Sequence, residues 1–197
     1  MSLDDVMDRL KSDSDQRNKW VGVYIGVLAV LLAVCSVGGG NAAKDATRAN
    51  IDAANTWAFF QAKNIRRSSI TMAADELDLL LAAQPNMPAD AKVRFAAKIK
   101  EYRDQIQKLT TDPVRQEGLD ELFVKAKAFE TERDAALRRD PYFDWSQAML
   151  QIAVVLASVH LIIGNFFLLG LSGGLGALGV LLMLNGFTLL VPLPFLG

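Results

Sequence analysis

The final 53 residues of the chain contain no aspartate, glutamate, lysine or arginine. His160 is the only side chain in this stretch that ionises near neutral pH. A water-soluble domain of that length needs charged side chains on its outer surface. This part of the sequence therefore indicates segments that lie in a lipid bilayer.

Charged residues gather between positions 41 and 144, which hold 17 of the 21 basic and 17 of the 22 acidic residues. Their charges cancel, and the whole chain carries a net charge of −1. Binding to nucleic acid by phosphate contacts needs a basic stripe, which is absent, so no nucleic-acid partner is expected. Cys35 is the only cysteine, which excludes an intramolecular disulfide and a cysteine-rich metal site.

Three uncharged stretches have the length of a membrane-spanning helix, about 20 residues. They are residues 20–37, 146–169 and 175–191, and a charged N-terminal tail, 1–19, precedes the first. Three glycines at 38–40 are expected to break or weaken the first helix where it leaves the membrane. Residues 170–174 should form a tight turn between the last two helices. Pro141 and the aromatic residues after it should form a hinge at the membrane surface.

Small residues at helical spacing predict close helix contacts in lipid, although glycine and alanine are also common in such helices. The predicted packing positions are Gly22, Gly26, Ala29, Ala33, Gly170 and Gly174. Three polar residues, His160, Asn165 and Asn185, lie within the apolar stretches. We expect interhelical hydrogen bonds from them; the alternative for His160 is a proton relay or a cofactor ligand.

The region between the first two apolar stretches, residues 41–140, predicts an extramembrane helical domain. A helix-favouring run ends at the turn-forming residues 85–88, and two further periodic runs follow. On the first run, Ile51, Ala54, Ala58, Ala62, Ile65, Ser69 and Met72 recur at helical spacing as the expected buried face. Amphipathic helices must pack against one another or against another copy. The fold class is therefore all-α, with three transmembrane helices and a helical hairpin or coiled-coil domain between the first and second.

No catalytic arrangement is evident in the sequence. Residues 174–179 match the G-x-G-x-x-G dinucleotide pattern, but no strand precedes them and no acidic residue follows. The single histidine is distant in sequence from any nucleophile of the polar region. We therefore predict no enzymatic activity, no catalytic residue, no cofactor, no metal and no small-molecule substrate.

Residues 49–63, with the sequence ANIDAANTWAFFQAK, resemble a segment of the bacterial membrane family catalogued as domain of unknown function 4337. The similar features cover nearly the whole chain: a charged tail, one span, this segment, a charged helical region and two closing spans. Family members also carry a tail rich in histidine and glutamate and a basic turn between the last two spans, and this chain has neither. The resemblance implies the same architecture, and the family has no assigned activity.

These observations predict a non-enzymatic accessory subunit or scaffold that binds other membrane proteins or itself. Within the family-like segment, Trp57, Phe60, Gln61 and Lys63 are the candidate partner-binding residues. A packed helix–helix core is an equally good interpretation of Trp57 and Phe60. The alternative function is a small channel or transporter subunit with a path lined by the polar residues of the closing helices.

The membrane side follows from the basic residues near the spans. The N-terminal tail carries four, and the flanks of the long loop carry five, namely Lys44, Arg48, Arg133, Arg138 and Arg139. Because the first helix usually dominates, we expect a multi-pass protein of the bacterial inner membrane with a cytoplasmic N-terminus and a periplasmic helical domain. The paired arginines before the second span favour the opposite orientation.

Overall fold

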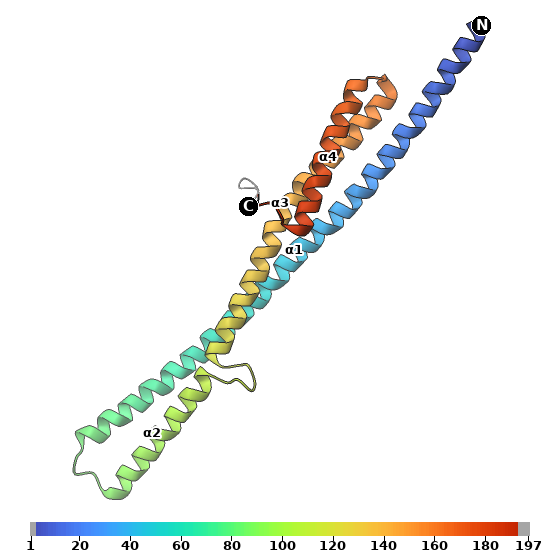
Figure 1. Ribbon diagram of the computed structural model, residues 1–197. Coiled ribbons are helices and arrows are strands. Elements are labelled where there is room, and N and C mark those ends of the chain that lie inside the picture. Colours follow the sequence, from blue (N-terminus) through green and yellow to red (C-terminus); the bar gives the residue numbers. More distant parts are fainter. Residues whose placement is uncertain (1–2, 193–197) are drawn as a thin grey trace. The chain divides into compact units, whose positions relative to one another are not determined.

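The described part of the chain is built from four α-helices (Figure 1). A computed structural model describes residues 3–192, so the first two residues of the predicted tail lie outside the described part. The helices are α1 (Leu3–Ala83), α2 (Ala89–Thr110), α3 (Leu119–Ile163) and α4 (Phe166–Thr188). No strand occurs among the described residues, which confirms the all-α prediction.

The chain forms two compact units, and the long helices α1 and α3 contribute to both. The first unit contains residues 1–46 and 134–197, and the second contains residues 47–133. Helices α1, α3 and α4 are each long and apolar enough to cross a membrane. This agrees with the three apolar stretches recognised in the sequence.

In the first unit, α3 and α4 pack against each other and against α1 (Figure 1). Within the predicted apolar stretch 146–169, the buried positions of α3 are 146, 150, 153, 157 and 160, and those of α4 are 172, 176, 179, 183 and 186. Both series alternate steps of four and three residues, the spacing of interlocking helices. The Ser146 hydroxyl donates to the Gly179 carbonyl at 2.7 Å, and the Ser172 hydroxyl donates to the Ala153 carbonyl at 2.7 Å.

The three glycines at 38–40 do not interrupt α1, so the predicted helix break is wrong. Gly38 and Gly39 are buried against the ring of Phe143 on α3. A Cβ atom added at Gly38 would lie 2.6 Å from the Phe143 ring and 2.8 Å from that of Phe187. Glycine is poor in a helix interior by about 1 kcal/mol, but here its missing side chain makes room for two aromatic rings.

The turn between the last two apolar helices is also displaced from its predicted position. Residues 170–174 lie inside α4, and the turn instead falls at Gly164 and Asn165. Gly164 has a φ of +74°, a value that only glycine adopts readily. The Asn165 side chain accepts a hydrogen bond from the Phe167 amide at 3.0 Å and so caps the start of α4.

The hinge expected at Pro141 is absent as well, because α3 continues through this residue. The residues that follow it, Tyr142 and Phe143, are both buried. The Tyr142 hydroxyl donates to the Val191 carbonyl at 3.2 Å, and the Phe143 carbonyl accepts a weak hydrogen bond from the Cys35 thiol at 3.4 Å. Packing on both sides thus holds α3 together where proline removes one backbone hydrogen bond.

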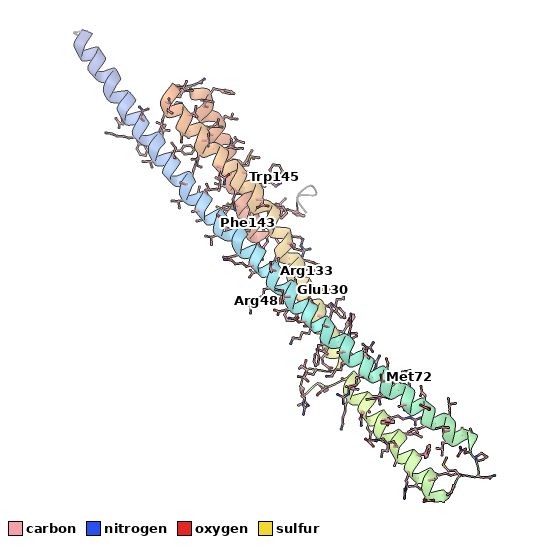
Figure 2. All side chains as sticks on the ribbon, turned by 180° about the vertical axis from the view of Figure 1, so that it is seen from behind. Arg48, Met72, Glu130, Arg133, Phe143 and Trp145 are labelled. Atoms are coloured by element: carbon pink, nitrogen blue, oxygen red, sulfur yellow. The ribbon has the colours of Figure 1, made fainter. Side chains whose placement is uncertain are left out.

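In the second unit, α2 and the first part of α3 pack on α1. The turn after Ala83 spans residues 84–88 and includes the predicted residues 85–88. The buried apolar side chains of the second unit are Ala49, Ala53, Ala74, Ile99, Leu119, Leu122 and Ala126. The α1 face expected to be buried, with Ile51, Ile65 and Met72, is instead exposed (Figure 2 labels Met72). The fully buried residues of α1 in this unit are alanines, and several of its larger apolar residues are exposed.

The role of Gly38 predicts opposite effects for two neighbouring substitutions. Gly38→Ala should lower the free energy of unfolding by about 1–3 kcal/mol, because the added methyl group has no space beside the buried Phe143 ring. Gly40→Ala should raise it by up to about 1 kcal/mol, since nothing lies within 4 Å of its added Cβ and alanine favours the helix. Thermal unfolding followed by circular dichroism in detergent measures both. Equal effects of the two changes would contradict this account.

Candidate functional site

Three aromatic rings form a cluster between α1 and α3 in the second unit. The Trp57 ring meets the Phe60 ring edge-on at 5.4 Å and the Phe123 ring edge-on at 5.5 Å between centroids. Phe60 and Phe123 are 6.4 Å apart. Edge-to-face geometry places the positive ring edge on a negative ring face, which stabilises such pairs. Two predicted partner-binding residues, Trp57 and Phe60, therefore contact each other and α3.

The Trp57 indole is also held by a charged pair on α3. Its Nε1 donates to the Glu130 carboxylate at 2.8 Å, and Lys127 donates to the other oxygen of that carboxylate at 2.8 Å. The Lys127 ammonium lies 5.7 Å from the Trp57 ring centre. Two hydrogen bonds hold the pKa of Glu130 below its usual value. The one from Lys127 contributes more than the one from Trp57. Both donors stabilise the ionised carboxylate.

The other two predicted residues have different surroundings. Lys63 donates to the backbone carbonyl of Glu117 in the α2–α3 loop, and its ammonium lies 5.1 Å from the ring centre of Phe59. Gln61 and Phe59 are exposed. Three of the four predicted residues thus connect α1 to α3 or its preceding loop, and Gln61 remains available at the surface.

Sequence reasoning missed the α3 half of this cluster, namely Phe123, Lys127 and Glu130. Lys127 and Glu130 are three residues apart, the spacing of a helical ion pair, which was a usable signal. Nothing local connects Glu130 with Trp57, 73 residues earlier in the chain. Their contact depends on how α1 and α3 align.

The three polar residues predicted to form interhelical hydrogen bonds, His160, Asn165 and Asn185, lie at or near helix ends. The His160 Nδ1 lies 2.8 Å from the Asn165 carbonyl oxygen, so these two residues close the α3–α4 turn. The Asn185 amide donates to the Val191 carbonyl at 2.7 Å, and its oxygen accepts from the Val191 amide at 2.9 Å. All three residues satisfy backbone groups where helices end, which is where unpaired groups are most costly in lipid.

The small-residue positions predicted to pack in lipid are exposed in the single chain. Gly22, Gly26, Ala29, Ala33, Gly170 and Gly174 are all exposed, and added Cβ atoms at the four glycines would meet nothing within 4 Å. The close contacts are made by a different set, Gly176, Gly179 and Gly186 on α4. The spacing in the sequence indicated that glycines pack against other helices, but it did not indicate which glycines do so.

Among residues 3–192, no group of three or more histidine, cysteine, aspartate or glutamate side chains could hold a metal ion. A shallow hollow of about 420 Å³ lies on α3 and the loop before it. Its lining residues are Gln116, Asp120, Glu121, Val124, Lys125 and Ala128.

The helices and contacts described above define an all-helical protein with three helices apolar enough to cross a membrane. The chain belongs to the family described as Domain of unknown function (DUF4337), whose model matches residues 17–189. The match includes both units and the Trp57 cluster. Neither a curated protein nor a solved structure shows significant similarity to the chain.

The hydrogen bond between Trp57 and Glu130 should stabilise the second unit measurably. We expect Trp57→Phe and Glu130→Gln each to lower its Tm by a few degrees, and the double variant to be little worse than the more harmful single change. Thermal unfolding by circular dichroism tests this. Glu101→Gln is the matched control, because Glu101 forms the same i,i+3 ion pair with Lys98, at 2.9 Å, without a tryptophan. An equal loss in the control would contradict the special role of the indole.

The lowered pKa of Glu130 predicts a pH dependence. A carboxyl whose pKa is lower in the folded state stabilises the fold above its unfolded pKa, about 4.3 for glutamate. That stabilisation should disappear as the pH falls through the folded value. Between pH 6 and pH 3, the Tm of the wild type should therefore fall further than that of Glu130→Gln. Parallel pH curves for the two proteins would exclude this contribution.

Proposed function

We propose that the protein is a non-enzymatic accessory or scaffold subunit of a membrane protein assembly. The observation that carries the proposal is the surface of the second unit, where large apolar side chains are exposed on helices otherwise rich in charge. They include Ile51, Ile65, Met72, Leu79 and Val124. Exposed apolar side chains of this number, on a unit that buries few, favour contact with other proteins.

Anchoring in the bilayer is supported by the first unit. The apolar parts of α1, α3 and α4 expose many valines, leucines and isoleucines, which suit a lipid environment. Trp20 and Trp145 are exposed near the starts of the apolar stretches of α1 and α3. Indole rings at such positions favour the headgroup layers of a membrane. We infer that α1, α3 and α4 cross the bacterial inner membrane and that the second unit lies outside it.

The orientation proposed for the chain has the N-terminus in the cytoplasm and the second unit in the periplasm. It rests on the four basic residues of the N-terminal tail, because the first helix usually dominates the orientation. The alternative function, a channel or transporter path, gains no support from His160, Asn165 and Asn185. Their polar groups face backbone partners at helix ends.

Purification from the native membrane tests the proposed function. The tagged protein, extracted in a mild detergent, should elute as an assembly well above its own 21.5 kDa plus the detergent micelle. Mass spectrometry of that fraction identifies the subunits. The matched control is the same extraction in a harsh detergent, which should release the single chain. Elution as a lone monomer under both conditions would overturn the proposal.

A further inference from the structure

One face of α1 in the second unit is apolar, exposed and regularly spaced. Ile51, Ala58, Ile65, Met72 and Leu79 recur at steps of seven residues. All five are exposed, and Ile65 retains 67% of its accessible surface. We call these five residues the outer α1 face. A strict seven-residue repeat is the pattern of a helix that winds around a partner helix.

Between Ile51 and Met72 the outer α1 face is flanked by small or uncharged side chains, whereas Asp75 and Glu76 occupy the equivalent positions between Met72 and Leu79. The neighbours are Ala54, Asn55, Gln61, Ala62, Ser68 and Ser69, all exposed. Among the charged residues between Ile51 and Met72, Asp52, Lys63 and Arg67 are less exposed and lie off this face, whereas Arg66 lies at its edge. Such a surface carries the residues of a helix–helix contact rather than those of a solvated helix side.

The partner helix is not supplied by the chain itself. The opposite side of α1 already packs within the second unit through Ala49, Ala53 and Ala74. The aromatic cluster of Trp57 and Phe60 occupies the same inner side. α1 therefore has two contact faces, and only the inner one is used in the single chain.

We propose that the outer α1 face binds the same face of a second copy of this chain, with the two helices parallel and in register. This inference rests on the proposed function and names its partner. Two copies in one bilayer share the same orientation, so helices leaving that bilayer meet in parallel. Each residue of the repeat then meets the same residue of the other copy, as a twofold interface requires.

The chemistry of the face suits self-pairing. Because no charge lies between Ile51 and Met72 on the face, the parallel pairing brings no like charges together there. The amides of Asn55 and Gln61 each carry donors and an acceptor, so either can pair with its own copy across a twofold axis. An unlike partner selected by charge would need a charged counterpart on this face. Ala58, Ala62 and Ser69 are small enough for close approach of the two backbones.

The buried area of the second unit leads to the same conclusion. Four of its seven buried apolar residues are alanines, which bury little surface. Two packed layers of helix with so small a core are marginally stable alone. Pairing through Ile51, Ile65, Met72 and Leu79 adds four large apolar side chains from each copy to a common core.

Disulfide trapping in native membranes tests the arrangement. Ile51→Cys and Leu79→Cys, made separately, should each give a covalent dimer on mild oxidation, since equivalent positions meet in a parallel pair. Val93→Cys on α2 is the control for random collision and should stay monomeric. The wild type should also stay monomeric, because its only cysteine, Cys35, is 0% exposed and cannot reach a second copy. Failure of either α1 variant to cross-link above these controls, as in an antiparallel pair, overturns the parallel arrangement.

A matched pair of charge substitutions gives an independent measurement. Ile65→Glu places a carboxylate in the proposed interface, whereas Val93→Glu places one at a site of similar exposure, 69%, on α2. We expect Ile65→Glu to raise the dimer dissociation constant at least about a hundredfold and Val93→Glu to leave it unchanged. Because Ile65 is exposed in the single chain, circular dichroism should show an unaltered fold. Equal dissociation constants for the two variants overturn the inference.

The proposed function and this inference fail in different ways. A wild-type protein that elutes only as a monomer removes both. An assembly in which the α1 cysteines do not cross-link, and in which Ile65→Glu changes nothing, leaves the accessory function standing and removes only the self-pairing face.

Discussion

The ring of Phe143 is the point on which the packing of the three apolar helices depends. It comes from α3, retains 1% of its accessible surface, and lies against Gly38 and Gly39 of α1 and Gly186 of α4. Its edge-on contact with Phe187 has a centroid distance of 4.9 Å. Helices in lipid gain little from the hydrophobic effect between them, because lipid tails are as apolar as leucine. Close fit must hold them together, and glycines that face an aromatic ring provide that fit.

A second requirement of an apolar environment is that polar groups find partners inside the protein. Ser146 and Ser172 bind carbonyls of facing helices, and His160, Asn165 and Asn185 close the ends of α3 and α4. In the described part of the chain, no buried side-chain nitrogen or oxygen lacks a hydrogen-bond partner. These five polar residues therefore serve helix contacts and helix ends, which explains their presence in segments otherwise free of charge.

Local chemistry was readable from the sequence, and alignment between distant segments was not. The turn at residues 84–88 was predictable because two prolines prevent a continuous helix. The glycines at 38–40 and 170–174 gave the same local signal, yet both groups lie inside helices. Their helix-breaking tendency, about 1 kcal/mol per glycine, is smaller than the gain from packing and continued hydrogen bonding. The Trp57 site was half predictable for the same reason: its own segment is distinctive, whereas Glu130 meets it only through the alignment of α1 and α3.

The distribution of side-chain size on α1 gives the strongest reason to look beyond the single chain. A helix that serves only its own fold places its largest apolar residues inside, because each buried methylene contributes about 0.8 kcal/mol. In the second unit α1 also leaves large apolar residues outside: Ile65, Met72 and Leu79 are exposed, whereas Ala49, Ala53 and Ala74 are buried. Alanines on the inner face allow the aromatic cluster and α3 to lie close to the helix. The larger residues outside contribute nothing to the isolated fold, so their free energy of burial remains available for association.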